Sequence, residues 1–340
     1  MLKTCIKVPK LEGEKTRRRL NDLEVIDKNY KIKSADGYVY IPIRDAAGIS
    51  QRFNFEKCDV EPLKKTPPKK IGVSYDVIGD IAIIDYSKDA KQIAQDILNT
   101  RKRIKVVLAA TSPVKGDYRL RDFVVMAGEN RTTTFHKEFG IILFVDVSKA
   151  YFNPRLSTER NRIAGLANSD EIVIDMFAGV GPFTIMLGKR VKKVIAMEIN
   201  PDAFTYLRKN VELNKLKNVD ALLGDAKKLS SQFKGVANRI IMNLPHSAFE
   251  FLEQAAIMLS ELGGTIHYYD IKEESCLPQT VGEVQELIEK NGRSIENVTV
   301  KSVRSYAPGL SIIVMDVTVA PLNFSNSCLR NYRGGRIRTF

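Results

Sequence analysis

The sequence predicts an α/β protein whose C-terminal half forms a mostly parallel sheet covered by helices, preceded by a small α/β domain and a β-rich domain. Three observations support this prediction. The chain has 340 residues, more than one domain of about 150 residues needs. After residue 150, apolar strand-like runs alternate with helical patterns, as in parallel sheets. Between residues 64 and 70, four lysines surround two prolines, a composition typical of a stiff linker.

The first domain is expected to span residues 1–66 and to end in this linker. Residues 38–43 have strand composition and residues 15–20 begin a basic helix. The N-terminus lacks the apolar stretch of a secretory signal, and no run approaches the roughly 20 apolar residues of a membrane span. The four cysteines are widely spaced and indicate neither a metal quartet nor a disulfide framework. We therefore expect a reduced, cytoplasmic protein without membrane contacts.

Residues 71–150 are expected to form the β-rich domain. Its strand-like runs are rich in β-branched residues, and one helical pattern at 90–100 interrupts them. The expected strands are 81–84, 105–108, 118–126, 132–136 and 141–147, the last two joined by a turn at 137–140.

Residues 151–322 are expected to form the third domain, with a seven-stranded sheet. Its strands alternate with helices until the last two, which follow one another directly. The expected strands are 172–176, 193–199, 220–223, 239–243, 264–271, 297–304 and 311–319. Residues 323–340 are predicted to be a disordered basic tail.

The net charge of +13 is unevenly distributed. Residues 1–70 carry +7, residues 71–168 carry +4 and the tail 321–340 carries +4, whereas residues 169–320 carry −2. A polyanion bound by the N-terminal parts fits this pattern, because each lysine or arginine that meets a phosphate releases a counterion. A basic, solvated surface explains the same charge, so charge alone leaves both readings open.

A glycine turn follows the first strand of the third domain. Gly179 and Gly181 allow a tight turn and close approach of a ligand. The third glycine of a dinucleotide fingerprint is replaced by Thr184, which disfavours a nicotinamide or flavin dinucleotide. Glu198 and Asp225 follow the next two strands, where carboxylates can reach a ribose and an adenine. This pattern is typical of S-adenosylmethionine in class I methyltransferases. The candidate cofactor-binding residues of this region are Asp175, Phe177, Gly179, Gly181, Glu198, Asn200 and Asp225.

The fourth strand ends in Asn243-Leu244-Pro245-His246. This tetrapeptide is similar to the Asn-Pro-Pro-aromatic motif of methyltransferases that act on planar nitrogens, with Leu244 in place of the first proline. An asparagine amide donates and accepts hydrogen bonds in one plane, and proline fixes the turn that presents it. Asn243 and Pro245 are therefore further candidates at the cofactor and substrate pocket.

Five stretches together resemble a known family. They are residues 128–132, 151–156, 175–183, 243–245 and 267–269. The combination resembles the archaeal and eukaryotic tRNA (guanine-37-N1)-methyltransferases over about residues 70–320, and most resembles the three-domain archaeal type. The resemblance implies a class I fold, S-adenosylmethionine as cofactor with S-adenosylhomocysteine as product, and a monomer. It also implies that the N-terminal domain contacts the tRNA elbow while the other two domains hold the anticodon branch.

The resemblance also implies catalytic roles. Glu159 corresponds to the family's general base, Arg119 to its catalytic arginine and Asn243 to its motif asparagine. Loss of the guanine N1 proton moves negative charge onto O6, which calls for a carboxylate and a facing cation. Tyr151 corresponds to a family tyrosine at the cofactor or target-base pocket, where it could stack on a flipped guanine. The candidate RNA-binding residues are Arg119, Arg121, Asn130, Arg131 and Arg155.

The local context of these residues suits their roles. Ser157 and Thr158 are expected to cap a helix that ends at Ala167, which places Glu159 in its first turn, where the dipole favours an ionised carboxylate. Residues 118–121 are strand-like, so Arg119 and Arg121 should share a face. Residues 267–269 are expected to line the cofactor pocket. The three histidines are too scattered to hold a metal, and we assign none.

Simpler explanations and rival functions remain. Gly179 and Gly181 could form an ordinary βα turn, Glu159 could simply favour a helix start, and Arg119 could be solvated or paired. Among enzymes, the tetrapeptide also suits methylation of an exocyclic amine, of another tRNA nucleotide or of a wyosine precursor at position 37. In a different class, the chain could be a non-catalytic RNA-binding protein with a methyltransferase-like fold.

Overall fold

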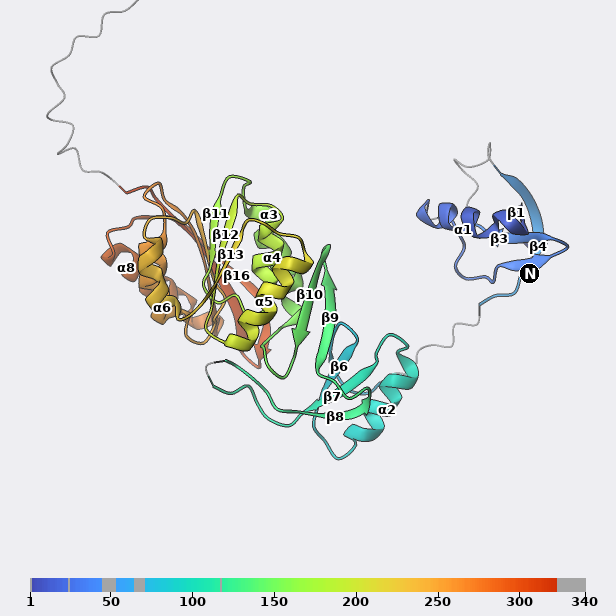
Figure 1. Ribbon diagram of the computed structural model, residues 1–340, viewed down its shortest axis with the longest axis horizontal. Helices are drawn as coiled ribbons and strands as arrows, with labels where there is room; N and C mark the ends of the chain where they lie inside the picture. Colours follow the sequence, from blue (N-terminus) through green and yellow to red (C-terminus); the bar gives the residue numbers. More distant parts are fainter. Residues whose placement is uncertain (1, 24, 45–52, 64–70, 117, 323–340) are drawn as a thin grey trace, which may run out of the picture. The chain divides into compact units, whose positions relative to one another are not determined.

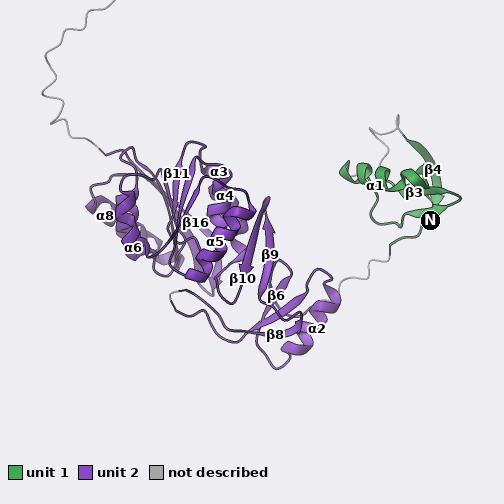
Figure 2. Cartoon of the chain, in the orientation of Figure 1, with its two compact units in different colours: residues 1–70 green, residues 71–340 purple. Residues whose placement is uncertain are grey.

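The computed structural model describes residues 2–23, 25–44, 53–63, 71–116 and 118–322 (Figure 1). The expected linker and the basic tail lie outside these residues. The chain divides into two compact units, residues 1–70 and residues 71–340, which are described separately below (Figure 2). No helix among the described residues is long and apolar enough to cross a membrane.

The first unit is an antiparallel sheet with one helix. Its strands follow the order β2-β3-β1-β4. Helix α1 (Gly13–Asp22) contains the expected basic helix, and its buried Leu20 packs with Ile6 and Ile41 of the sheet. Strand β3 confirms the expected strand at 38–43, whereas the other three were not predicted. The strands are β1 (Leu2–Pro9), β2 (Lys33–Ala35), β3 (Tyr38–Pro42) and β4 (Asn54–Asp59), and a 3-10 turn, η1 (Lys10–Glu12), precedes α1.

A disulfide joins Cys5 and Cys58 in this unit. The expectation that the cysteines form no disulfide is wrong for this pair. Strands β1 and β4 are neighbours in the sheet, which places the two Cα atoms 6.2 Å apart, within the span of a disulfide. The two cysteines are 53 residues apart in the sequence, so their proximity arises from strand pairing that local patterns do not show.

Residues 71–150 form a four-stranded sheet and a hairpin. The sheet order is β5-β6-β7-β8, and α2 (Ala90–Thr100), which matches the expected helix, connects the parallel pair β6 and β7. The sheet strands are β5 (Asp76–Ile78), β6 (Ile81–Asp85), β7 (Val106–Ala110) and β8 (Phe123–Gly128), and the hairpin strands are β9 (Thr133–Glu138) and β10 (Ile141–Asp146).

The strand expected at 118–126 begins only at Phe123, so its first part was predicted wrongly. Tyr118 and Arg119 lie in a turn, and an isolated bridge joins Lys115 and Leu120 across it. The backbone of Arg119 is left-handed, with φ of 55°. The chain reverses direction around Gly116, so the alternation that a strand would impose on Arg119 and Arg121 does not apply.

A seven-stranded sheet in the order β13-β12-β11-β14-β15-β17-β16 forms the centre of the last region. The first five strands in this order, β13, β12, β11, β14 and β15, are parallel, and β17 is antiparallel to both of its neighbours. All seven expected strands are present. They are β11 (Ile172–Asp175), β12 (Lys193–Glu198), β13 (Val219–Leu223), β14 (Arg239–Met242), β15 (Gly264–Lys272), β16 (Ile295–Ala307) and β17 (Leu310–Val319).

Helices cover both faces of this sheet. One apolar core contains residues of α3, α4 and α5, and the other contains residues of α6, α7 and α8. Figure 1 shows α3, α4 and α5 together, with α6 and α8 across the sheet. The helices are α3 (Ser157–Leu166), α4 (Pro182–Gly188), α5 (Pro201–Leu213), α6 (Ala226–Leu229), α7 (Leu252–Met258) and α8 (Leu277–Lys290), and the 3-10 turns are η2 (Pro154–Leu156), η3 (Ser230–Phe233), η4 (Ala248–Phe251) and η5 (Glu274–Cys276).

The strand order reverses between β11 and β14. In open α/β sheets, ligands bind beyond the carboxyl ends of the strands at such a reversal. The glycine turn follows β11, and Asn243 follows β14, so both border this position. The fold therefore places the two motifs on either side of one candidate site.

Candidate active site

The glycine turn has the backbone geometry that its sequence predicts. Gly179 and Gly181 have φ of 57° and 88°, values that only glycine adopts readily. A Cβ on Gly181 would lie 2.5 Å from Leu207 Cδ1, so this position has no room for a side chain. A Cβ on Gly179 would have only the Tyr151 carbonyl oxygen nearby, at 3.7 Å. Gly181 therefore serves helix packing, whereas Gly179 leaves an open surface beside Tyr151.

Glu198 closes the turn from the next strand. Its Oε2 accepts a hydrogen bond from Gly179 N at 2.6 Å and its Oε1 accepts one from Asn200 N at 2.8 Å. Burial raises the pKa of this carboxyl. The Asn200 side chain joins α5 to the segment before Tyr151. Its Oδ1 accepts hydrogen bonds from the first N–H groups of α5, and its Nδ2 donates one to Lys149 O at 2.8 Å.

Asp175 is fully buried beneath the turn. Its Oδ2 accepts a hydrogen bond from Thr184 Oγ1 at 2.7 Å, so the residue that replaces the third glycine anchors this carboxylate. Its Oδ1 is buried and has no hydrogen-bond partner within the part of the chain that the structure describes. Burial raises the pKa of Asp175 to about 6. A buried acceptor without a partner is costly unless a ligand supplies a donor.

The remaining cofactor candidates are a helix cap, a packed aromatic ring and two residues at the end of β14. Asp225 caps α6 by accepting a hydrogen bond from Lys227 N at 2.9 Å. Phe177 packs edge-on against Phe251, with ring centroids 4.9 Å apart. Pro245 is buried and Asn243 is half-buried at the end of β14.

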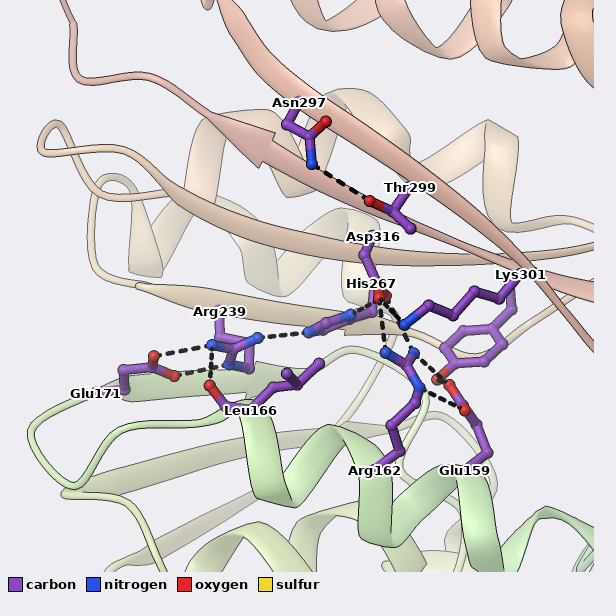
Figure 3. A network of polar contacts seen from close by, with 11 residues as sticks. Glu159, Arg162, Leu166, Glu171, Arg239, His267, Asn297, Thr299, Lys301 and Asp316 are labelled. Atoms are coloured by element: carbon purple, nitrogen blue, oxygen red, sulfur yellow. Dashed lines mark hydrogen bonds and ion pairs between the residues drawn. The ribbon is translucent and has the colours of Figure 1, made fainter.

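Glu159 is buried in the first turn of α3 (Figure 3). Both of its oxygens accept hydrogen bonds from Arg162, Oε2 from Nε at 2.8 Å and Oε1 from Nη2 at 2.7 Å. Oε1 also accepts the Tyr269 hydroxyl at 2.8 Å. Because Oε2 has one of these hydrogen bonds and Oε1 has two, Oε2 has more capacity to accept a proton.

The expected cap of α3 is not formed. Neither Ser157 nor Thr158 caps the helix, because the 3-10 turn η2 runs directly into it. Asn153 caps that turn by accepting a hydrogen bond from Arg155 N at 3.0 Å. Glu159 nevertheless occupies the first helical turn, as expected.

The Arg119 side chain lies over the aromatic ring of Tyr151. Its guanidinium carbon lies 4.8 Å from the centre of the Tyr151 ring. Burial, and then the charge of Arg119, lower the pKa of His246, which stacks edge-on against Tyr306 at 5.8 Å. The turn that contains Arg119 thus lies close to the Asn243–His246 motif.

A cavity of about 190 Å³ adjoins Arg119 and Tyr151. Sequence patterns did not identify Arg304 of β16, which lines it with three of the expected arginines. The charged and aromatic lining residues are Asp76, Arg119, Arg121, Phe123, Tyr151, Phe152, Arg155 and Arg304.

The expected RNA-binding residues divide into two groups. Arg131 is held by internal carboxylates: it pairs with both oxygens of Asp80, at 2.6 and 3.0 Å, and with Glu129 at 2.7 Å. Asn130 is exposed, Arg155 pairs with Asp76, and Arg121 donates to Ser112 O at 3.1 Å. The cavity brings Arg121 and Arg155 together, whereas Arg131 supports the fold.

Residues 267–269, which were expected to line the cofactor pocket, are buried side chains of β15. His267 and Tyr269 are fully buried and belong to the polar network around Glu159. Tyr268 donates its hydroxyl to Asp270 at 2.8 Å. Sequence patterns also missed Arg162, although its position three residues after Glu159 on a helix is a signal for such a pair.

Comparisons with known proteins place this geometry in a family. Models of the TRM5/TYW2 methyltransferase domain, the tRNA methyltransferase 5 N-terminal domain and the TYW2 N-terminal domain match residues 134–297, 5–50 and 61–132. The chain is 39% identical over 334 residues to tRNA (guanine(37)-N(1))-methyltransferase Trm5b of Pyrococcus abyssi, a match covering 93% of this chain and 99% of that protein. The chain belongs to the Trm5 family of tRNA (guanine-37-N1)-methyltransferases.

Solved structures of this family have the same fold. A complex of aTrm5 and tRNALeu matches with a TM-score of 0.67 and 37% identity, over 92% of this chain and 99% of that one. A TYW2 from M. jannaschii in complex with AdoMet matches with a TM-score of 0.60 and 31% identity, over 73% of this chain and all of that one. The Trm5 match therefore extends over a larger part of this chain than the TYW2 match does.

Proposed function

We propose that this chain transfers a methyl group from S-adenosylmethionine to N1 of guanosine 37 of tRNA and releases S-adenosylhomocysteine. The observation that carries the proposal is the buried Glu159 carboxylate with an available acceptor position on Oε2. It occurs in a chain that matches Trm5b of P. abyssi along almost the full length of both.

The residues around the glycine turn fit the cofactor. The buried, unpartnered Oδ1 of Asp175 suits a donor such as the cofactor's ammonium group. The open surface at Gly179 and the carboxylate of Glu198 suit an adenosine with free ribose hydroxyls. When bound, S-adenosylmethionine supplies a methyl group activated by its sulfonium.

Side chains of this protein accept the guanine N1 proton and stabilise the negative charge that develops on O6. Guanine N1 carries a proton that must leave, and Glu159 Oε2 accepts it. The negative charge that develops on O6 faces the Arg119 guanidinium, while the Asn243 amide holds the edge of the base. The base must leave the anticodon stack to reach these groups, and the Tyr151 ring beneath Arg119 offers a surface on which it stacks.

The chain binds tRNA as a monomer in the cytoplasm. Residues 1–66 contact the elbow, and residues 71–150 and 151–322 hold the anticodon branch. Arg121 and Arg155 support this division because they line the cavity that also contains Arg119. Their charges neutralise phosphates next to the flipped base.

The length of the match favours N1 methylation over the wyosine alternative. A relative named tRNA 4-demethylwyosine(37)-methyltransferase Taw21, from Saccharolobus solfataricus, matches 57% of this chain, whereas the Trm5b match includes the N-terminal unit. Inosine at position 37 separates N1 chemistry from exocyclic-amine chemistry, because it keeps the N1 proton and lacks the 2-amino group. Methylation of the inosine transcript supports N1, and its absence supports the amine.

Substitution of Glu159 tests the proposed base. Single-turnover methyl transfer to a G37 transcript should fall by roughly 100-fold or more in Glu159→Gln, since a positioned base contributes about 10²- to 10⁴-fold. S-adenosylmethionine affinity, measured by calorimetry, should stay near the wild-type value. A Glu159→Gln enzyme with wild-type single-turnover rate contradicts the base assignment.

A further inference from the structure

A polar network of buried and partly buried side chains continues from Glu159 to Asp316, His267 and Arg239 (Figure 3). Arg162 contacts Glu159 with its Nε and Nη2 atoms and Asp316 of β17 with its Nη1 and Nη2 atoms, the latter at 2.7 and 3.2 Å. Asp316 also accepts a hydrogen bond from His267 Nδ1 at 2.6 Å, and His267 Nε2 contacts Arg239 Nη1 at 2.6 Å. One guanidinium is thus shared by two carboxylates.

The contacts of Arg239 determine which nitrogen of His267 donates a hydrogen bond and which accepts one. Arg239 pairs with Glu171 at 2.7 and 2.9 Å and can only donate, so His267 Nε2 must be the unprotonated acceptor. Nδ1 then carries the proton and donates to Asp316. Burial lowers the pKa of His267, which agrees with a neutral ring. Asp316 is therefore held ionised, and the pairing with His267 and Arg162 keeps its pKa well below the usual range.

We propose that Arg162 and Asp316 are positioning residues for the reaction, and that their pairing lets Glu159 gain a proton without leaving the partly buried Arg162 as an unpaired charge. This inference depends on the proposed function of Glu159. When Glu159 is ionised, Arg162 serves both carboxylates. When Glu159 Oε2 takes the N1 proton, Arg162 remains neutralised by Asp316. A charge that is partly removed from water is less stable without a partner, so this sharing lowers the cost of the proton transfer.

The surroundings of Glu159 support this assignment. The groups facing it are Arg162 from its own helix and Tyr269 from β15, and Asp316, His267 and Lys301 lie behind Arg162. Lys301 Nζ is 4.0 Å from Asp316 Oδ2 and half-exposed, so it is a weaker partner. The neighbouring Arg160 is turned away from the site and pairs with Glu138 through two contacts of 2.6 Å.

Two substitutions should shift the pH dependence in opposite directions. Arg162→Gln removes the cation beside Glu159, so the acid limb of the single-turnover rate should move to higher pH by about 1 pH unit. Asp316→Asn leaves the whole guanidinium charge to Glu159, so the acid limb should move to lower pH. A structural role alone would not produce opposite shifts.

The rates provide a second readout. Arg162→Gln should lower the rate at pH 7.5 by roughly 10- to 100-fold, because displacing a catalytic group by about 1 Å can cost ~100-fold. Arg162→Lys should recover part of this loss, and the dissociation constants for S-adenosylmethionine and tRNA should not change. Arg293→Gln is the control: Arg293 is a buried arginine outside this network, it donates to the carbonyl oxygens of Ser260 and Leu259, and its loss should leave the rate and pH profile unchanged.

Full-length variants are first compared by thermal unfolding. Wild-type rate and pH profile in Arg162→Gln overturn the proposal. If that variant does not fold, Asp316→Asn decides: an acid limb that stays in place or moves to higher pH overturns it. Failure of the proposed function is recognised separately, because Glu159→Gln would then retain the wild-type rate whatever the other variants do.

Discussion

Asp175 combines a stability cost with the cofactor-binding role that we propose for it. Because burial raises its pKa to about 6, the folded state keeps a proton that the unfolded state releases near pH 4. The resulting loss of stability grows as the pH rises from about 4 to 6 and is complete above it. Asp175→Asn should therefore raise the free energy of unfolding at pH 7.5 by up to about 3 kcal/mol, with a smaller gain at pH 4.5.

The same substitution should weaken cofactor binding, since the orphaned Oδ1 is the acceptor that we assign to the ligand. Denaturant titration at both pH values and calorimetry with S-adenosylmethionine measure the two effects. Wild-type cofactor affinity in the variant would show that Asp175 has only a structural role.

Arg119 is expected to act on the developing charge of the base. Arg119→Ala should lower the single-turnover rate by roughly 100-fold, as loss of one donor to a developing oxyanion does, while cofactor affinity stays unchanged. Arg121→Ala, which removes a nearby arginine of the same cavity, should instead raise the dissociation constant for tRNA. A loss of cofactor affinity in Arg119→Ala, with a normal rate at saturation, would assign Arg119 to the cofactor.

The local geometry of some residues could be predicted from the sequence, and the contacts of others could not. Gly179, Gly181 and Glu198 were predictable because their positions after successive strands are visible in the linear pattern. Arg131 was not, because its partner Asp80 is 51 residues away. The pairing of Arg162 with Asp316, 154 residues later, likewise depends on the order of strands in the sheet.

At the scale of elements, the disulfide constrains the N-terminal sheet. It closes a loop of 53 residues between β1 and β4, for which the chain-entropy model gives a stabilisation of about 4 kcal/mol. Cys58→Ser should therefore make β1 and β4 exchange their amide protons much faster, with no change in the seven-stranded sheet or in helix α3, which carries Glu159. Hydrogen exchange with mass spectrometry measures this, and Cys276→Ser, at the exposed free cysteine, is the control. Unchanged protection of β1 and β4 in Cys58→Ser would contradict the expected stabilisation.

The predicted elements show the same contrast between local and long-range information. The seven strands of the large sheet were found because most contain apolar runs buried on both faces, such as β12, whose four central residues are all apolar and buried. Strand β4, Asn54–Asp59, was missed because most of its residues are exposed and three are charged. The turn at Arg119 was missed because its arginines and apolar residues alternate as in a strand.

At the scale of the whole molecule, charge and fold are divided between the units. Among its described residues, the second unit has apolar cores of its own, so a fragment of residues 71–340 should keep its fold and its cofactor affinity. The first 70 residues carry +7, and their removal should weaken tRNA binding and flatten its dependence on salt. Titrations of tRNA at several salt concentrations, with the full chain and the fragment, test this. Identical slopes would contradict a role of the first unit in binding tRNA.

Transfer of a labelled methyl group from S-adenosylmethionine to tRNA tests the central claim most directly. Two unmodified transcripts that differ only in guanosine or adenosine at position 37 are compared, and the products are digested to nucleosides. We predict label in 1-methylguanosine from the first transcript and none from the second. Equal labelling of both transcripts, or label in any other nucleoside, would contradict methylation of N1 at guanosine 37.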